Sequence, residues 1–505
     1  MNRIGCDHIL KQPGLRPAVA SLMGVILSPL LPSKLALAQL IAPDNTLGPE
    51  QSVVAPGATA NDFVINGGAQ RNTALFHSFE RFGINPNQTV FFSNPAAVEN
   101  IFARVTGGTA SNINGLLGVD GPANLFFVNP SGILFGPNAR LDVAGAFVAT
   151  TADQFLLPNG NSFNAANPNA PPLLTVSVPL GVQFGANPQP MTVNGSRLET
   201  AVGAPLALLG GEVTLEGAEL LAPGGRVGLG GLSQSGTIFF DLEAATSENF
   251  LTIPVLGRSN LFLNNSTVDA VHEGGGDIVL QAQTISLIQT DLFVGLNDNV
   301  IDLDAQGGDI LLSGTGDIQL TESTVRSDAS SEGLSGDIQI NARHLMLANG
   351  SVVDAGTFGA GSSGDIFINT TESVTLQGTL NGQPSRIVTQ LQNPGEFDGG
   401  NIELITGQLT IRDGGQISAS TTPGSEGNAG NVLIEANRSI FVTGSSPVPS
   451  GIFTRSLGNG DAGNVEILSP TITMSNGAQI SMSSSAGAAG RLFIDANTAV
   501  LDNAA

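Results

Sequence analysis

A short motif that recurs along the second half of the chain constrains the fold more than any other feature. The motif is Gly, then Asp or Asn, then an aliphatic residue, and its copies begin at Gly276, Gly308, Gly336, Gly364, Gly400, Gly430 and Gly463, with a degenerate last copy at Gly490. Successive copies are 32, 28, 28, 36, 30, 33 and 27 residues apart. Strand patterns and turns that repeat in this way without helices indicate a solenoid.

The residues between the copies are typical of strands and corners. Alternating runs such as Ile338-Gln339-Ile340 follow the motif, and later come Asn-Gly or Asp-Gly turns such as Asn349-Gly350 and Asp413-Gly414. We predict an all-β fold, a right-handed single-stranded parallel β-helix of the pectin-lyase-like kind, with Gly or Asn at corners of positive φ. A leucine-rich repeat has a shorter period, and a WD propeller needs Trp, which the chain lacks. Another propeller or an immunoglobulin-like array is the alternative.

The charge balance is acidic and argues against nucleic acid as a partner. The formal net charge is −24, and charged residues are only 12 % of the 505 residues. Beyond residue 38 every basic residue is Arg, and these are scattered along the chain. Binding to DNA or RNA needs a concentrated basic surface, so we expect no nucleic-acid partner.

The N-terminus has the pattern of an export signal. Arg3, Lys11 and Arg16 precede the apolar stretch 18–31, and Ala36-Leu37-Ala38 is a small-x-small cleavage site. A membrane anchor would need about 20 uninterrupted apolar residues, and Pro29, Pro32 and Lys34 break this segment. We predict a signal peptide over residues 1–38, read by the Sec export machinery and cleaved after Ala38. The one Cys of the chain, Cys6, would leave with it.

Longer motifs follow between Asn61 and Ala152. In chain order they are Leu75-Phe76-His77-Ser78-Phe79, the run from Phe102 to Gly108, Ser111-Asn112-Ile113-Asn114-Gly115, the run from Ala123 to Gly136, the run from Asn138 to Val143, and the run from Phe147 to Ala152. This ordered set resembles the secretion domain of the filamentous haemagglutinin family, the exported partner of two-partner secretion. The resemblance implies a β-helical cap recognised by an outer-membrane barrel transporter with periplasmic soluble domains.

Two short motifs of that family can be placed on this chain. The family's Asn-Pro-Asn-Gly-Ile motif corresponds to Asn129-Pro130-Ser131-Gly132-Ile133, with Ser in place of the second Asn. From the residues alone, this is a tight turn in which Gly132 takes a left-handed conformation before a strand begins at Ile133. The same residues are either a purely structural corner or a recognition feature. The family's earlier Asn-Pro-Asn-Leu motif is matched only by Asn94 and Pro95.

Residues suited to catalysis or metal binding are scarce after the signal. There is no Lys and no Cys beyond residue 38, and His77, His272 and His344 are far apart in sequence. We expect His77 to be a packed or capping residue. The runs Gly274-Gly275-Gly276-Asp277 and Gly307-Gly308-Asp309 have no nine-residue period, so we interpret them as corners, with weak calcium binding left open. We predict no enzyme activity and no cofactor.

These observations predict three regions: the signal peptide at 1–38, a two-partner secretion (haemagglutinin activity) domain with a β-helical cap at 39–200, and a β-helix repeat rod at 201–505. The predicted function is an exported adhesin-type protein, secreted or at the cell surface in association with the outer membrane, that meets a surface receptor or matrix. One alternative is the delivery stem of a contact-dependent toxin. The other is a polysaccharide-acting β-helix enzyme.

Overall fold

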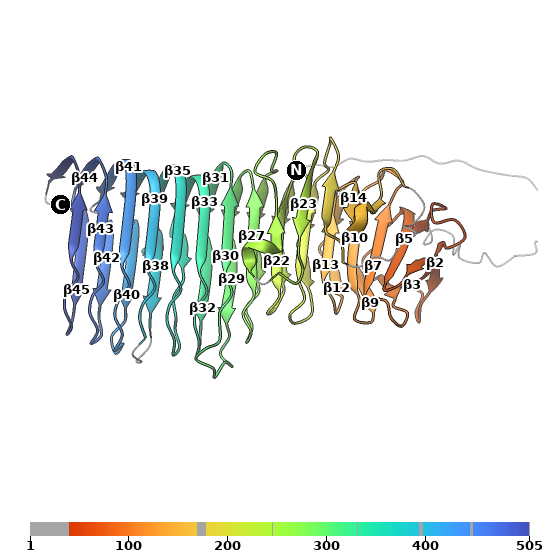
Figure 1. The fold of residues 1–505 in the computed structure, drawn as a ribbon, viewed down its shortest axis with the longest axis horizontal. Helices are drawn as coiled ribbons and strands as arrows, with labels where there is room; N and C mark the ends of the chain where they lie inside the picture. Colours follow the sequence, from red (N-terminus) through yellow and green to blue (C-terminus); the bar gives the residue numbers. More distant parts are fainter. Residues whose placement is uncertain are drawn as a thin grey trace, which may run out of the picture. The chain divides into compact units, whose positions relative to one another are not determined.

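The structure is a computed structural model that describes residues 40–168, 178–244, 246–330, 332–392, 397–444 and 448–503. The chain divides into Met1–Gln39, which lies outside the described residues, and one compact unit, Leu40–Ala505. Within the described part of this unit, helical structure is confined to the short α1 (Ser247–Phe250) and a 3₁₀ turn (Pro158–Gly160), and the rest is strands and connections (Figure 1). The expected all-β fold is confirmed.

The strands form coils that stack along one axis of the unit (Figure 1). One coil consists of β27 (Asp277–Ala282), β28 (Ile285–Ile288) and β29 (Asp291–Leu296). Each of the three strands pairs in parallel with its equivalent on the next coil, namely β30, β31 and β32. Stacking of equivalent parallel strands is the architecture of a parallel β-helix. Propellers and immunoglobulin-like arrays have antiparallel sheets, so those alternatives are wrong.

The coils build three parallel ladders of strands. The first ladder consists of β5 (Ala74–Arg81), β7 (Asn100–Val105), β10 (Asn124–Val128), β13 (Phe147–Thr150), β19 (Leu206–Gly210), β22 (Arg226–Gly231), β27, β30 (Ile310–Gly314), β33 (Ile338–Ala348), β35 (Ile366–Gln377), β39 (Ile402–Arg412), β41 (Val432–Thr443), β43 (Val465–Leu468) and β46 (Leu492–Asp495). The second ladder consists of β8 (Ser111–Ile113), β11 (Ile133–Phe135), β17 (Met191–Asn194), β20 (Val213–Glu216), β25 (Leu261–Asn264), β28, β31 (Asp317–Thr321), the later halves of β33, β35, β39 and β41, β44 (Thr471–Ser475) and β47 (Thr498–Asp502).

The third ladder consists of two sheets. Near the N-terminal end these strands are β2 (Ser52–Pro56), β3 (Asp62–Gly67), β6 (Thr89–Ser93), β9 (Leu116–Asp120) and β12 (Arg140–Asp142). Further along they are β18 (Arg197–Glu199), β21 (Glu219–Leu221), β26 (Thr267–Asp269), β29, β32 (Thr324–Ala329), β34 (Val352–Asp354), β38 (Arg386–Leu391), β40 (Gln416–Thr421), β42 (Gly451–Ser456) and β45 (Gln479–Ser484). The short strands β1 (Ala42–Pro43), β4 (Ala69–Arg71), β36 (Thr379–Leu380) and β37 (Gln383–Pro384) make antiparallel pairs, as β2 does with β3.

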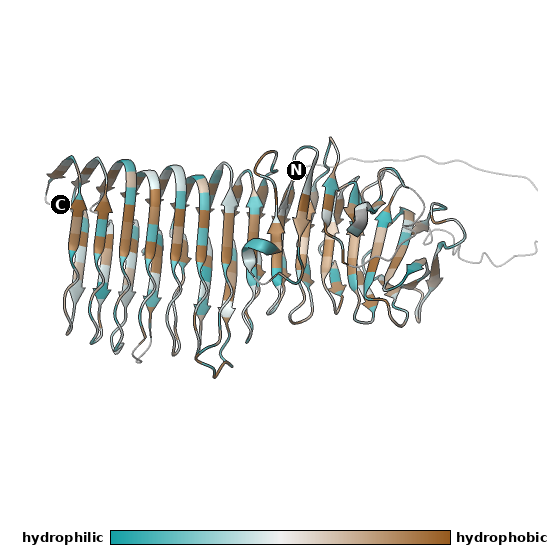
Figure 2. Ribbon diagram, viewed as in Figure 1, coloured by the Kyte–Doolittle hydropathy of each residue, from teal (hydrophilic) through white to brown (hydrophobic). Residues whose placement is uncertain are grey.

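One apolar core runs inside the coils from Ile41 to Ala478. In β33 and the strands after it, apolar and polar residues alternate, so that only one face of the ladder is buried. Figure 2 shows the apolar residues aligned in bands across neighbouring strands. This period of two is what a strand with one wet face requires.

The first ladder is buried on both faces over its earlier coils, because a second sheet covers its outer side. This lateral sheet is antiparallel, in the order β15 (Ser162–Asn164), β14 (Gln154–Leu156), β16 (Gly181–Phe184), β23 (Gly236–Phe240) and β24 (Leu251–Thr252). Between them lies a second core in which Phe102 stacks on Phe76 and Phe126 at centroid distances of 5.1 and 4.8 Å. The sequence patterns described above do not predict this sheet.

One column of outward-facing residues marks where the lateral cover ends. Adjacent coils place Phe76, Phe102, Phe126, Val148, Ala207, Gly228, Val279, Leu311 and Gln339 in one register. The column is apolar or Gly up to Leu311 and polar at Gln339. A covered β-helix therefore passes into an uncovered one at this point.

The repeated motif makes two columns of its own. A Cβ atom added to Gly308, Gly336, Gly364, Gly400, Gly430, Gly463 or Gly490 would lie 1.8 to 2.1 Å from the carbonyl oxygen of the preceding member. These glycines do not have a positive φ. They are required because neighbouring coils approach closely at this corner, and not for a left-handed conformation as we expected of corner glycines.

The residue after each glycine forms a hydrogen-bonded column. The side-chain Oδ1 of each Asp or Asn accepts the backbone N–H of its equivalent one coil later, from Asp277 through Asp309, Asp337, Asp365, Asn401, Asn431 and Asn464 to the N–H of Arg491. We call this the Asx column. In its later part the Asn side chains also donate to the preceding Oδ1.

The predicted positive φ occurs at a different corner. Asn349, Asp413 and Asn476 have φ of 54°, 53° and 57°, and the glycine after each is also positive. The Asn-Gly and Asp-Gly turns therefore have the left-handed backbone that the sequence predicts.

Candidate functional site

The expected secretion motif forms the turn between β10 and β11. The N–H of Gly132 donates to the carbonyl of Asn129 at 3.1 Å, and the N–H of Ser131 donates to Asn129 Oδ1 at 2.9 Å. Gly132 has φ of 108°, and β11 begins at Ile133. The left-handed glycine and the strand start that the sequence predicts are thus both present.

The Asn129 side chain lies inside the turn. It is fully buried, and its Nδ2 donates to the carbonyl of Thr109 and to Ser111 Oγ, each at 2.9 Å. Pro130 and Ser131 are half-buried, and Leu134 on the following strand is 36 % exposed. Any surface that this motif offers to a partner is therefore made by Pro130, Ser131 and Leu134, while Asn129 and Gly132 fix the backbone.

The partial second motif lies in the turn after β6. Asn94 is half-buried, Pro95 is exposed, and the carbonyl of Pro95 accepts the N–H of Val98 at 3.1 Å. Asn94 Oδ1 is buried and has no hydrogen-bond partner among the described residues. Ala97 has φ of 71°, a left-handed conformation that L-residues other than Asn and Asp seldom adopt. The two motifs occupy separate turns, one after β6 and one between β10 and β11.

A buried polar network at the N-terminal end went unpredicted. The Arg104 guanidinium is fully buried and donates to Ser78 Oγ, Thr46 Oγ1 and the carbonyl of Asn164 at 2.8 to 2.9 Å. It also lies 4.3 Å from the centroid of the Phe163 ring. Burial lowers the pKa of Arg104 to about 10, against the opposing charge of Asp44. The network ties the entry segment, the first ladder and the lateral sheet together.

Asp44 completes this network. Its Oδ2 accepts hydrogen bonds from Ser78 Oγ at 2.7 Å and from Thr106 Oγ1 at 2.6 Å. Burial raises the pKa of the Asp44 carboxyl, but the hydrogen bonds from Thr106, Thr46 and Ser78 outweigh burial and hold the pKa below its usual range. In the sequence, the only sign of this network is that Arg104 and Asp44 are isolated charged residues among apolar ones.

His77 is packed, as the sequence predicts. It is fully buried, its Nδ1 lies 3.1 Å from Ser52 Oγ, and its ring packs against Phe92 at a centroid distance of 5.2 Å. Its Nε2 has no hydrogen-bond partner among the described residues. Burial lowers the pKa of His77 to about 3, so the ring is neutral near pH 7.

Metal ligands do not gather anywhere in the described ranges. No group of three or more His, Cys, Asp or Glu side chains there is placed to hold a metal ion. The Gly-Asp runs that raised the question of calcium belong to the Asx column, where Asp277 and Asp309 each accept a backbone N–H from the next coil. The predicted cleavage-site residues Ala36 and Ala38 lie outside the described residues.

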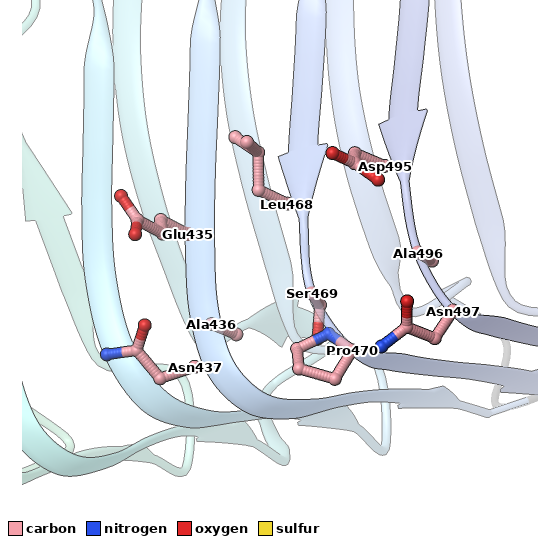
Figure 3. Close-up of a pocket in the computed structure, with 9 residues that line it drawn as sticks. All are labelled: Glu435, Ala436, Asn437, Leu468, Ser469, Pro470, Asp495, Ala496 and Asn497. Carbon is pink, nitrogen blue, oxygen red and sulfur yellow. The ribbon is translucent and has the colours of Figure 1, made fainter.

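A shallow recess of about 260 Å³ lies on the outer side of the later coils (Figure 3). Strand register places Glu435, Leu468 and Asp495 on successive coils, and Figure 3 draws the two carboxylates on either side of Leu468. Two coil steps hold the backbones of Glu435 and Asp495 about 10 Å apart. Its lining holds these two carboxylates and no His, Arg or Lys.

The helices among the described residues include none long and apolar enough to cross a membrane. Residues 39–280 match the family model of the TPS secretion domain. The chain carries a TPS secretion domain. The sequence resemblance to exported partners of two-partner secretion is confirmed, and the matched range ends on β27, close to where the lateral cover of the first ladder ends.

Similarity to individual proteins is lower or covers less of the chain than the match to the family model. The heme/hemopexin-binding protein of Haemophilus influenzae is 37 % identical over 86 residues, which are 17 % of this chain and 9 % of that protein. Among solved structures, the HMW1 secretion domain of Haemophilus influenzae has a TM-score of 0.49 at 16 % identity, covering 89 % of this chain and 98 % of that one. The filamentous hemagglutinin secretion domain has a TM-score of 0.36 at 15 % identity, covering 68 % and 98 %.

The match over residues 39–280 supports an exported protein of two-partner secretion. Proteins with this domain leave the cell through an outer-membrane transporter, which is the partner that the domain implies in general. The boundary that we predict between residues 200 and 201 stays a prediction.

Proposed function

We propose that Sec carries the chain to the periplasm, where the periplasmic soluble domains of a cognate outer-membrane barrel transporter recognise the TPS secretion domain. In this route the signal peptide at residues 1–38 is the signal that Sec recognises. The turn of Asn129 to Ile133 is the motif that the transporter recognises, with Asn94 and Pro95 as a partial second motif. The buried hydrogen bonds of Asn129 support this role, because they hold Pro130 and Ser131 in one defined conformation at the surface.

We propose further that the coils after the secretion domain form an adhesive rod, secreted or held at the cell surface, which meets a receptor or matrix. The observation that carries this proposal is the change at Gln339, after which the lateral sheet no longer covers the outer face of the first ladder. An uncovered, repeating face offers many similar contacts. Each polar contact contributes about 1 kcal/mol, so useful affinity comes from many coils together.

The test removes coils without breaking the columns. Deletion of residues 337–364 joins Gly336 to Asp365, and deletion of residues 337–430 joins Gly336 to Asn431, so both variants keep a Gly-Asx step at the junction. We expect normal amounts of secreted protein from both variants and a stepwise loss of attachment to cells or matrix. Abolition of attachment by the shorter deletion alone would point to one local binding site instead. Turnover of a polysaccharide by the purified protein would replace the adhesive role with an enzymatic one.

A further inference from the structure

A hollow that has no role in the proposed export route lies beside the start of the Asx column. It is a cavity of about 420 Å³ bordered by the corners that lead into β22, β27 and β30, and by Thr246 and Ser247 at the start of α1. Half of its lining residues are glycines, among them Gly274, Gly276 and Gly308. The cavity exists because these corners carry no side chains.

Three charged residues, Arg226, Asp277 and Asp309, belong to its lining. Arg226 Nε donates to Asp277 Oδ2 at 2.7 Å, and both side chains are largely buried, at 23 % and 14 % exposure. Asp277 Oδ1 is taken by the N–H of Asp309, and Asp309 Oδ1 by the N–H of Asp337. Within the described residues, the Nη groups of Arg226 and Oδ2 of Asp309 form no hydrogen bond. The lining therefore offers free donors at Arg226 and a free acceptor at Asp309.

We propose that this cavity binds a neutral, hydroxyl-rich ligand, a single saccharide unit, through Arg226, Asp309 and Ser247. Vicinal hydroxyl groups both donate and accept hydrogen bonds, which matches the free guanidinium N–H groups, the free carboxylate oxygen and the Ser247 hydroxyl. The volume lies within the range of about 300 to 1,000 Å³ found for small-ligand pockets.

The charges of the cavity argue for a neutral ligand. Arg226 and Asp277 already balance each other, and an anion would meet two carboxylates while a cation would meet the guanidinium. Burial, the largest cause, together with the neighbouring carboxylates Asp277, Asp337 and Glu248, raises the pKa of Asp309 to about 6, although the N–H of Asp337 opposes this. The apolar lining is limited to Pro205 and Leu242 besides the glycines, which is too little for a lipid or an aromatic ligand.

The proposed ligand site is independent of the proposed roles in export and adhesion. It is therefore tested with purified protein, without an assay of secretion or attachment. We would titrate the purified full chain with glucose, galactose, mannose and N-acetylglucosamine, following binding by saturation-transfer NMR and calorimetry. We expect at least one sugar to bind with a dissociation constant of about 1 mM. Binding by none of the four would overturn the proposal.

One glycine allows the cavity to be filled without disturbing the fold. Gly274 lines the cavity, a Cβ there meets no atom within 4 Å, and its φ is not positive, so Gly274→Leu adds a bulky side chain at the cavity border without a clash. We expect Gly274→Leu to abolish sugar binding at an unchanged unfolding temperature. Ala96→Leu, which adds the same side chain at an exposed turn elsewhere, should bind as the parent does. Equal binding by Gly274→Leu and the parent would contradict the site.

The variant Asp309→Asn distinguishes a saccharide site from a cation site. The Asn keeps an oxygen for the Asp337 N–H and turns its amide toward Asp277 Oδ1, as Asn401 does toward Asp365, so the free acceptor is lost while the column remains. We expect sugar binding to weaken about fivefold. A parallel titration with calcium chloride gives the opposing outcome: calcium binding that Asp309→Asn removes, without binding of any sugar, would make this a cation site.

Discussion

Asp309 Oδ1 lies 2.9 Å from the backbone nitrogen of Asp337, the equivalent residue one coil later. The same contact recurs along the Asx column, with carboxylates in its first four members and amides in the next three. An amide can both accept the next N–H and donate to the preceding oxygen, as Asn431 does. A carboxylate can only accept, and it brings a negative charge close to its neighbours.

This difference predicts that Asp309→Asn stabilises the protein at neutral pH. The folded state raises the pKa of Asp309 from 3.8 to about 6 through burial and the nearby carboxylates, so folding favours the protonated form. That contribution is present in full below pH 3.8 and is lost as the pH rises through 6. Because Asp309 is only partly buried and water screens its charge, we expect a gain of about 1 kcal/mol at pH 7.5.

The measurement is urea unfolding of both proteins at pH 7.5 and at pH 4, with hydrogen exchange of β30 and β33 as the local readout. The gain should shrink at pH 4, where the parent carboxyl is protonated. Asp317→Asn, on the next strand of the same coil but outside the column, is the matched control. A gain of equal size at both pH values would show that the charge of Asp309 is not its cause.

The stacked glycines of the repeated motif predict that one added methyl group strongly lowers the stability of the protein. A Cβ at Gly364 would lie 2.1 Å from the carbonyl oxygen of Gly336, so Gly364→Ala must push two coils apart. We expect a loss of about 3 kcal/mol in the free energy of unfolding, with faster hydrogen exchange in β33 and β35. Gly274→Ala adds the same atom where nothing lies within 4 Å and should change little. Equal effects of the two substitutions would exclude the close approach as the reason for the column.

Much of this fold can be read from the sequence, because the β-helix repeats its chemistry once per coil. The recurrence of the Gly-Asx step predicts the coils, the alternation in Ile338-Gln339-Ile340 predicts a strand, and the Asn349-Gly350 turn predicts its positive φ. The lateral sheet could not be predicted in the same way, since it is antiparallel and occurs once. Its trace in the sequence is the continuous apolar run Ile278-Val279-Leu280, where both faces of the strand are buried.

The site was less predictable than the fold. The motif at Asn129 could be placed by resemblance, and its turn could be derived from Pro130 and Gly132. The burial of Asn129 could not, because its partners Thr109 and Ser111 lie on the neighbouring coil. Single hydrogen bonds of the Arg104 network join residues up to 62 positions apart, and no local pattern encodes such pairs.

The burial of His77 predicts that acid loosens the N-terminal coils first. Folding lowers the pKa of His77 from 6.5 to about 3, so its contribution to stability is present above pH 6.5 and is lost as the pH falls toward 3. The loss amounts to roughly 1.4 kcal/mol for each pH unit in this window. Asp309 and Asp328, with raised pKa values of about 6, have the opposite sign in the middle coils.

Hydrogen exchange from pH 7 to pH 4.5 tests this order, after correction for the intrinsic exchange rates. Protection in β5 should fall with pH while protection in β32 does not. His77→Gln should remove the pH dependence of β5, and His344→Gln, at a half-buried site outside the N-terminal coils, should leave it as in the parent. A uniform loss of protection along all coils would rule out His77 as the cause.

The turn geometry predicts which residues of the secretion motif export depends on. Asn129 and Gly132 are buried and set the backbone, whereas Ser131 contributes a half-buried hydroxyl and keeps its N–H bond to Asn129 Oδ1 when truncated. We expect the double variant Asn129→Ala, Gly132→Ala to accumulate in the periplasm and Ser131→Ala to be secreted normally. Secreted and periplasmic fractions, measured with the cognate transporter, give the answer. Normal secretion of the double variant would make the motif dispensable in this chain.

The partial second motif predicts a stabilising substitution. Ala97 is exposed and has φ of 71°, a conformation that costs an L-residue about 1 to 2 kcal/mol and glycine almost nothing. Ala97→Gly removes this conformational cost, but glycine loses more backbone entropy than alanine on folding, which offsets part of the benefit. We therefore expect a net stabilisation of about 0.5 to 1 kcal/mol. Ala96→Gly, one residue earlier at negative φ, carries only the entropic cost and should destabilise the same turn by about 0.5 to 1 kcal/mol. Hydrogen exchange in β6 and β7, which flank the turn, should therefore be slower in Ala97→Gly and faster in Ala96→Gly than in the parent. Changes of the same sign in both would mean that backbone strain at Ala97 does not govern the stability of this turn.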